Sequence, residues 1–219
     1  MRVLALIPAY NEEATVASII LGVRRLVPDV LVVDDGSQDG TNAAACAAGA
    51  LVQRLDLNMG KGEALKAGFA YAIENGYDGV LTLDGDGQHD TKDIAAFLSL
   101  LDRYDLILGN RMEDSKRIPL LRLAANRTAS FMVSVACRQR IRDSQSGFRF
   151  YSAPLLKNVG LRCSRYDLET EVIIKSARQG FRIGDCRVRT IYAGEVSRFS
   201  NIWDSVRFLK VVILSLLGR

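Results

Sequence analysis

Short apolar runs alternate with longer amphipathic stretches through the first half of the chain. The short runs are rich in Val, Leu and Ile and predict strands at Val3–Pro8, Val30–Val33, Leu51–Leu55, Gly79–Leu83 and Leu106–Leu108. The stretches between them have helical periodicity and predict helices at Glu12–Val27, Thr41–Ala48, Gly62–Glu74 and Lys92–Leu101. This alternation predicts an α/β fold with a mostly parallel central sheet and helices on both faces, as in a Rossmann-like sandwich.

The second half of the chain is less regular. Its pattern predicts helices at Leu120–Cys137 and Leu168–Arg178, and strands at Phe148–Tyr151 and Arg182–Ile191. The apolar stretch Val206–Leu217 is interrupted by two cations and is too short to cross a bilayer. It predicts an amphipathic end helix that lies on a membrane or packs against the body. Without repeats or a low-complexity linker, residues 1–219 are expected to form one domain.

Polar clusters follow the predicted strands of the first half. They are Asn11-Glu12, Asp34 to Ser37, Asn58, Asp84 to Gln88, and Asn110-Arg111. In open parallel sheets, ligands bind at the carboxyl ends of the strands. The sequence therefore predicts a ligand site along this edge.

The segment from Asp84 to His89 carries the strongest chemical signal. Alternation in an extended segment places Asp84, Asp86 and Gln88 on the same side. Three hard oxygen donors can hold a divalent cation, and the cation can hold a diphosphate. His89 is the only histidine, so a zinc site is excluded and a packing or supporting role is favoured.

Charge divides the chain. Residues 1–110 contain 8 Lys and Arg against 16 Asp and Glu, whereas residues 111–219 contain 21 against 9. The basic half indicates an anionic partner such as a phosphate, a nucleic acid or a lipid surface. Arginine matches phosphate oxygens in bidentate geometry. The candidates are Arg111, Arg127, Arg149 and Arg198, each of which is otherwise a surface arginine.

Two acidic residues near the start of a predicted helix are weaker candidates. Charge complementarity to the helix N-terminus explains one of Glu169 and Glu171 without a site. The loop Asn58–Ala64 lacks the spacing of a nucleoside-triphosphate loop, and no dinucleotide-binding glycine motif follows the first strand. The four cysteines have no paired spacing and are interpreted as reduced, buried thiols of a cytosolic protein.

Together these motifs resemble the family-2 glycosyltransferases with the GT-A fold, in the branch of polyprenyl-phosphate sugar transferases similar to dolichol-phosphate mannose synthase. The matching segments are Ile7 to Glu12, Val33 to Ser37, Asn58 to Gly62, Asp84 to His89, Gly109 to Arg111, and Asp143 to Arg149. The chain departs from that branch at Gly87 and Asp90, beside the metal motif, and at Arg198, where a lysine is common.

The resemblance implies a role for each matching residue. It implies that Asp84 approaches the ribose or sugar and that Asp86 and Gln88 ligate Mg²⁺ or Mn²⁺. The residues that would enclose the nucleoside are Pro8, Tyr10, Glu12 and Asp35. The arginines that would surround the donor and acceptor phosphates are Arg111, Arg127 and Arg198. Residues 1–110 would form the nucleotide-sugar half, and residues 111–219 the acceptor half with its amphipathic end helix.

The expected reaction is metal-dependent, inverting transfer of a hexose from GDP-mannose or a UDP-hexose to a polyprenyl phosphate. Because a phosphate monoester is already anionic near pH 7, this acceptor needs no strong base. A saccharide hydroxyl acceptor is the alternative, and it would require a base, for which Asp143 is the best candidate. We expect peripheral attachment at the inner face of the cytoplasmic membrane.

Three rival classes fit the sequence less well. A sugar-phosphate nucleotidyltransferase would show a glycine-rich basic loop after the first strand, where this chain has Pro8 to Glu13. A nucleic-acid-binding module would interleave basic and exposed aromatic residues, whereas most aromatic residues here lie within apolar stretches. A nucleotide-sugar-binding protein without turnover is disfavoured by the intact Asp84, Asp86 and Gln88.

Overall fold

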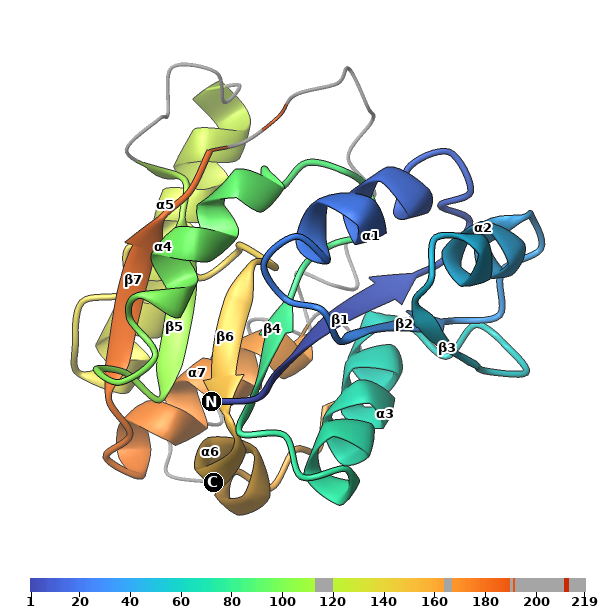
Figure 1. The fold of residues 1–219 in the computed structure, drawn as a ribbon. Coiled ribbons are helices and arrows are strands. Elements are labelled where there is room, and N and C mark those ends of the chain that lie inside the picture. The colour runs from blue at the N-terminus through green and yellow to red at the C-terminus, as the bar shows by residue number, and fades with distance from the viewer. Residues whose placement is uncertain (113–119, 164–166, 190, 192–210, 213–219) are drawn as a thin grey trace.

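The computed structural model describes residues 1–112, 120–163, 167–189, 191 and 211–212 (Figure 1). Arg198 and nearly all of the predicted end helix, Val206–Leu217, lie outside the described residues. Val212 is described, and it is buried in the core cluster that also contains Val133 and Ile173.

Seven strands form one sheet. The strands are β1 (Val3–Ala9), β2 (Val30–Asp34), β3 (Leu51–Arg54), β4 (Gly79–Thr82), β5 (Leu106–Asn110), β6 (Arg149–Ser152) and β7 (Ile183–Arg187). Their order is β3-β2-β1-β4-β6-β5-β7. All pairs are parallel except those of β6, which runs antiparallel between β4 and β5. The predicted mostly parallel sheet is confirmed.

Helices cover both faces of the sheet. They are α1 (Val16–Val23), α2 (Thr41–Ala47), α3 (Lys61–Glu74), α4 (Ile94–Leu98), α5 (Leu120–Cys137), α6 (Ala153–Asn158) and α7 (Asp167–Arg178). Because side chains alternate along a strand, Leu4 and Leu6 of β1 pack in one core cluster and Ala5 and Ile7 in the other. The first cluster joins α3, α5, α6 and α7, and the second joins α1, α2 and α4. This confirms the prediction of helices on both faces.

Two predicted helices are shorter in the structure. The predicted Glu12–Val27 is α1 alone, because the residues before Thr15 form a turn around the Glu12 carbonyl. The predicted Lys92–Leu101 begins as a 3₁₀ turn, Thr91–Asp93, whose Asp90 side chain accepts a hydrogen bond from the Lys92 N–H.

Helix α6 was not predicted, although its signal is present in the sequence. The Ser152 side chain accepts a hydrogen bond from the Leu155 N–H, and Pro154 lies in the first turn. Serine at the N-cap with proline just inside the helix is a standard start signal, which a helix as short as α6 makes easy to overlook.

The structure shows the state of the cysteines and whether a described helix could span a membrane. All four cysteines are free thiols; Cys137 and Cys186 are buried as predicted, but Cys46 is exposed and Cys163 half-buried. Among the described residues, no helix has the length and apolar character needed to span a bilayer.

Candidate active site

The candidate site lies where β1, β2, β4 and β5 end. Asp84 follows β4, Asp35 follows β2 and Arg111 follows β5. Strand β6 starts at this same edge, because Arg149 is the partner of Thr82 on one side and of Leu108 on the other. The turn that precedes β6, residues 143–148, therefore joins the edge predicted from the first half of the chain.

Asp84 is held on both sides by positively polarised groups. The Lys61 Nζ lies 2.6 Å from its Oδ1, and the His89 Nε2 lies 3.1 Å from its Oδ2. Burial would raise the pKa of the Asp84 carboxyl, but Lys61 and His89 hold the pKa well below its ordinary value. Asp84 is therefore a fixed anion, oriented before any ligand binds.

Lys61 also holds a second carboxylate. Its Nζ lies 3.1 Å from the Glu169 Oε2, at the start of α7. Burial disfavours the charged ammonium, but Asp84 and Glu169 raise the pKa of Lys61 above its ordinary value. One lysine thus links the strand end after β4 to the start of α7.

Asp86 has a different environment. Its Oδ1 accepts a hydrogen bond of 3.0 Å from the Gln88 N–H. Burial and the neighbouring Asp84 charge raise the pKa of Asp86, although that hydrogen bond opposes the shift. A bound divalent cation would remove this repulsion, so the Asp86 carboxylate fits the metal that the sequence predicts. Residues 85–87 form a turn instead of the predicted extended segment, so alternation along a strand does not align Gln88 with Asp86.

The protein supplies only part of such a metal site. In the part of the chain that the structure describes, no three His, Cys, Asp or Glu side chains converge as a metal-binding cluster. Mg²⁺ is commonly held by one or two carboxylates together with substrate phosphates and water. The predicted ligand pair therefore suits a cation that arrives with a diphosphate.

The residues predicted to enclose the nucleoside lie at the ends of β1 and β2. Pro8 and Tyr10 are half-buried, and Glu12 is buried with its N–H donating to Thr41 Oγ1 over 2.7 Å. Both carboxylate oxygens of Asp35 accept loop hydrogen bonds, from the Met59 N–H at 2.7 Å and the Gly60 N–H at 2.8 Å. Asp35 thereby fixes the loop that leads into Lys61.

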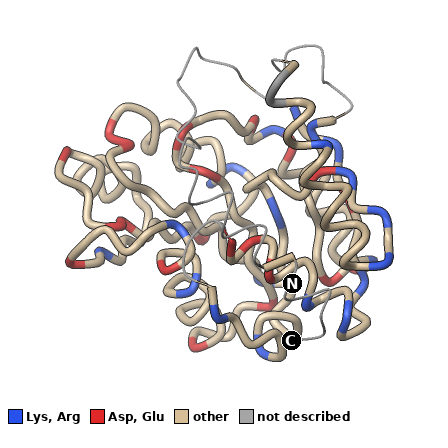
Figure 2. The backbone as a smooth tube through the Cα atoms, turned by 180° about the vertical axis from the view of Figure 1, so that it is seen from behind, with Lys and Arg blue, Asp and Glu red and all other residues tan. Residues whose placement is uncertain are grey.

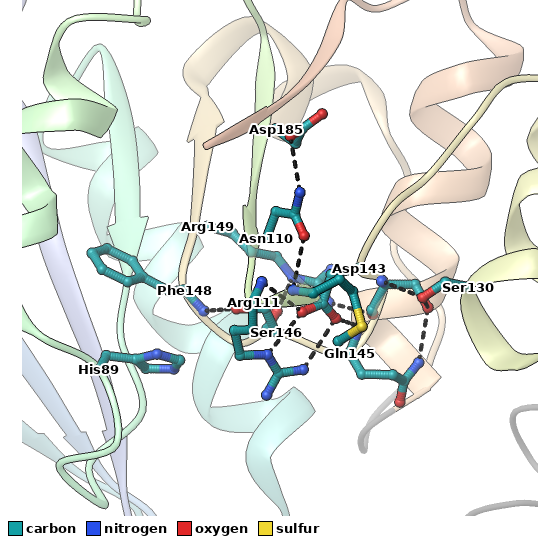
Figure 3. Close-up of polar contacts among 12 residues, drawn as sticks. His89, Asn110, Arg111, Ser130, Asp143, Gln145, Ser146, Phe148, Arg149 and Asp185 are labelled. Carbon is teal, nitrogen blue, oxygen red and sulfur yellow. Dashed lines mark hydrogen bonds and ion pairs between the residues drawn. The ribbon is translucent and has the colours of Figure 1, made fainter. Parts of the chain in front are cut away.

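Arg111 and Asp143 form a bidentate pair (Figure 3). Arg111 Nε lies 2.8 Å from Asp143 Oδ2, and Nη2 lies 3.0 Å from Oδ1. Burial would raise the pKa of Asp143, but Arg111 and the Gln145 N–H hold it below its ordinary value. A buried carboxylate with a lowered pKa is a poor proton acceptor, so the predicted general-base role of Asp143 does not fit the structure.

Arg149 is a second correction. Only 1% of this residue is exposed, and its guanidinium donates to three backbone carbonyls, those of Ser144, Ser146 and Glu169. Its Nε also lies 3.7 Å from the Glu169 carboxylate. Arg149 braces the turn before β6 against α7, and it does not present its guanidinium to a ligand as predicted.

The remaining candidate residues have different surroundings in the structure. Arg127 is exposed on α5, and none of the contacts described for it joins it to Asp84 or Asp86. Glu171 accepts from the Arg162 and Cys163 N–H groups and pairs with Lys175, so it caps a loop. His89 is buried and packs on Phe148 with 5.3 Å between ring centroids, as expected for a supporting role.

Lys61 is the site residue that sequence reasoning missed. A signal was available, because Lys61 is the first residue of α3, where the helix dipole disfavours a cation. A lysine in that position requires compensating carboxylates, and Asp84 and Glu169 supply them.

Gly147 gives a test of how tightly Asp84 is held. A Cβ added at Gly147 would lie 2.3 Å from Asp84 Oδ2, and Asp84 cannot retreat without breaking its contacts to Lys61 and His89. We expect Gly147→Ala to lower kcat/KM by about tenfold or more, since small displacements of positioning groups cost up to about a hundredfold. Steady-state kinetics check this, with Gly160→Ala as control because a Cβ there meets nothing within 4 Å. Equal activity of both variants would contradict the tight packing of Asp84.

The chain is similar in sequence to known glycosyltransferases. The family model described as glycosyl transferase family 2 matches residues 5–160. A UDP-N-acetylglucosamine–dolichyl-phosphate N-acetylglucosaminyltransferase of Methanococcus voltae is 27% identical over 240 residues, which cover 98% of this chain and 96% of that protein. An undecaprenyl-phosphate mannosyltransferase of Micrococcus luteus is 31% identical over 196 residues, which cover 84% of this chain and 81% of that protein.

A solved structure shares the fold. Glucosyl-3-phosphoglycerate synthase from Mycobacterium tuberculosis, in complex with Mn²⁺, UDP and phosphoglyceric acid, superposes with a TM-score of 0.74 at 23% identity. The match covers 99% of this chain and 77% of that one. The chain therefore belongs to glycosyl transferase family 2, has the GT-A fold, and is a glycosyltransferase.

Proposed function

We propose that this enzyme transfers a hexose from a nucleotide-diphosphate sugar to a polyprenyl phosphate, with inversion at the anomeric carbon. The observation that carries the proposal is the contrast between neighbouring carboxylates. Asp84 stays ionised because it pairs with Lys61, whereas burial and the Asp84 charge raise the pKa of Asp86. This arrangement suits a cation brought by the donor, and the two relatives named above are both polyprenyl-phosphate sugar transferases by name.

The nucleotide-sugar donor would bind at the edge of the sheet where β1, β2 and β4 end. Asp86 and Gln88 would hold Mg²⁺ or Mn²⁺, which supplies Lewis-acid stabilisation of the leaving diphosphate. The presence of Mn²⁺ and UDP in the similarly folded synthase supports this assignment. Asp84, fixed as an anion, accepts hydrogen bonds from the ribose or the sugar. The surface for a guanine or uracil nucleoside is made by Pro8, Tyr10, Glu12 and Asp35.

The acceptor side depends on the chemistry of the nucleophile. A phosphate monoester is ionised near pH 7 and can attack without a base, whereas a sugar hydroxyl cannot. The hydroxyl alternative needed Asp143, whose lowered pKa and pairing with Arg111 disfavour it. Arg111 and Arg198 would orient the acceptor phosphate, and Arg127, exposed on α5, would help to attract it. Charge stabilisation rather than proton transfer would carry the reaction.

The setting of the reaction follows from its acceptor. A polyprenyl phosphate is embedded in a bilayer, so the enzyme would act as a peripheral protein at the inner face of the cytoplasmic membrane. We further propose that residues 1–219 work as one domain, because strands on both sides of residue 110 pair in the same sheet.

Transfer of label into the organic phase tests the function. We expect the protein, in detergent with Mg²⁺ or Mn²⁺, to transfer label from GDP-mannose or a UDP-hexose to undecaprenyl phosphate. Undecaprenol, which lacks the phosphate, is the matched control and should receive no label. Label that appears only on a soluble saccharide would contradict the lipid acceptor.

A further inference from the structure

Helix α5 has two unlike faces. Its inner face is buried in the body, through Leu123, Ser130 and Val133. Its outer face leaves three large apolar side chains in water: Leu120 is 83% exposed, Phe131 69% and Val135 49%. Residues spaced by three, four, seven or eleven positions lie along one side of a helix. We call this side the α5 outer face; it consists of Leu120, Ala124, Arg127, Phe131 and Val135, together with Arg138, which directly follows the helix.

The charge around this face has a single sign. Between Asp114 and Asp143 the sequence contains seven Lys and Arg and no Asp or Glu. Among the described residues of this stretch, Arg127, Arg138, Arg140 and Arg142 are exposed, and Arg142 pairs with Asp185. In Figure 2, Lys and Arg gather on the side of the molecule formed by the second half of the chain, while Asp and Glu predominate on the other side. The exposed apolar stripe is therefore flanked by cations.

We propose that the α5 outer face docks on an anionic lipid surface. This inference rests on the proposed function, since it names the surface from which that function would draw its acceptor. Exposed Phe and Leu side chains beside arginines are typical of helices that lie in the headgroup region of a bilayer. The apolar residues enter the interface, and the arginines bind the negative lipid headgroups.

The charge pattern favours lipid over a second copy of the chain. Two α5 outer faces packed together would bring arginines from both copies to one contact, without any acidic residue on either helix to pair with them. Like charges at a contact oppose association. An anionic bilayer supplies the missing negative charge along the whole helix.

Docking through α5 would also place the catalytic edge close to the lipid. The inner face of α5 contacts the turn before β6, where Ser130 Oγ accepts a hydrogen bond of 2.9 Å from the Ser144 N–H. Ser144 follows Asp143, which holds Arg111. A helix with its side chains is about 10 Å thick, so only this thickness separates the docked surface from the turn that positions Arg111.

Vesicle sedimentation tests the proposal. We expect the full chain to partition onto phosphatidylcholine vesicles that contain phosphatidylglycerol, and to be released by salt. Arg138→Gln should weaken this partition by about fivefold, because one basic residue near an anionic surface contributes about that factor. Phe131→Asp should weaken it by about fivefold or more, because it removes an apolar side chain from the interface and adds a negative charge. The matched controls carry the same changes on exposed residues away from α5, Leu21→Asp on α1 and Arg103→Gln, and should bind like the wild type.

Three results would overturn the proposal. One is failure of the wild type to bind anionic vesicles at low salt, and another is equal loss of binding in the control variants. The third is a wild-type dimer that Phe131→Asp converts to a monomer, which would assign the face to a second copy. Thermal unfolding establishes that the variants fold. Transfer in detergent is expected to be unchanged in Phe131→Asp, so a failure of docking is distinguishable from a failure of the proposed reaction.

Discussion

Replacement of Asp86 by alanine is expected to lower kcat/KM by about a thousandfold. Asp86 has a raised pKa beside the fixed Asp84 charge, which marks it as the carboxylate that a cation would neutralise. Loss of one preorganised group that stabilises charge in the transition state costs about a hundred- to a thousandfold in rate. Initial rates at saturating Mg²⁺ or Mn²⁺ measure this effect, and binding of Mn²⁺ to the protein with the nucleotide measures its cause.

Asp90→Asn is the matched control for Asp86→Ala. Asp90 lies in the same segment, but its side chain caps the 3₁₀ turn and pairs with Arg189 at 3.3 Å. Asparagine retains the cap, so this variant should keep most of its activity. Turnover by Asp86→Ala that persists in EDTA would contradict both the metal and the role of Asp86.

Lys61→Met is expected to lower the free energy of unfolding by about 3 kcal/mol. Lys61 is 17% exposed at its side chain and pairs with both Asp84 and Glu169. Removal of one partner from a buried ion pair leaves uncompensated charge, which costs about 3–5 kcal/mol when fully buried. We also expect kcat/KM to fall, because Asp84 loses the contact that orients it. Urea unfolding and steady-state kinetics on the same preparation measure both effects.

A second lysine on α3 provides the comparison. Lys66 pairs with Glu63 at the same 2.6 Å, but both partners are on one helix and more exposed. Lys66→Met should therefore change the unfolding free energy by no more than about 0.5 kcal/mol. The double variant Lys61→Met/Glu169→Gln should recover part of the loss, since it removes one of the two stranded charges. Equal stability of Lys61→Met and Lys66→Met would show that the buried network is unimportant.

The fold was predictable where a segment's own pattern decides its structure. Apolar runs such as Val30–Val33 are too short for helices and are bounded by turns, and the 3.6-residue period of Leu120–Cys137 matches α5 residue for residue. The place of β6 was not predictable in this way. Its four residues read as a strand, but its antiparallel pairing with β4 and β5 depends on segments far away in the sequence.

The site residues, too, were predictable only where the local sequence decides their position. The residues along the strand ends were predictable because the chain itself places Asp84, Asp86 and Arg111 after strands. The destination of a side chain is set by contacts between distant segments, so the sequence did not reveal that Arg149 faces inward. For the same reason it offered Asp143 as a base, since only the structure supplies Arg111 as its partner.

The central position of β6 has a consequence for how the chain folds while it is being synthesised. Strand β4 leaves the ribosome long before β6, and until β6 arrives one of its edges has unpaired backbone groups beside an apolar surface. The growing chain is therefore most prone to aggregate during that interval. Synthesis of β6 closes the gap in the sheet, and the later synthesis of α7 supplies the Glu169 carbonyl that Arg149 binds.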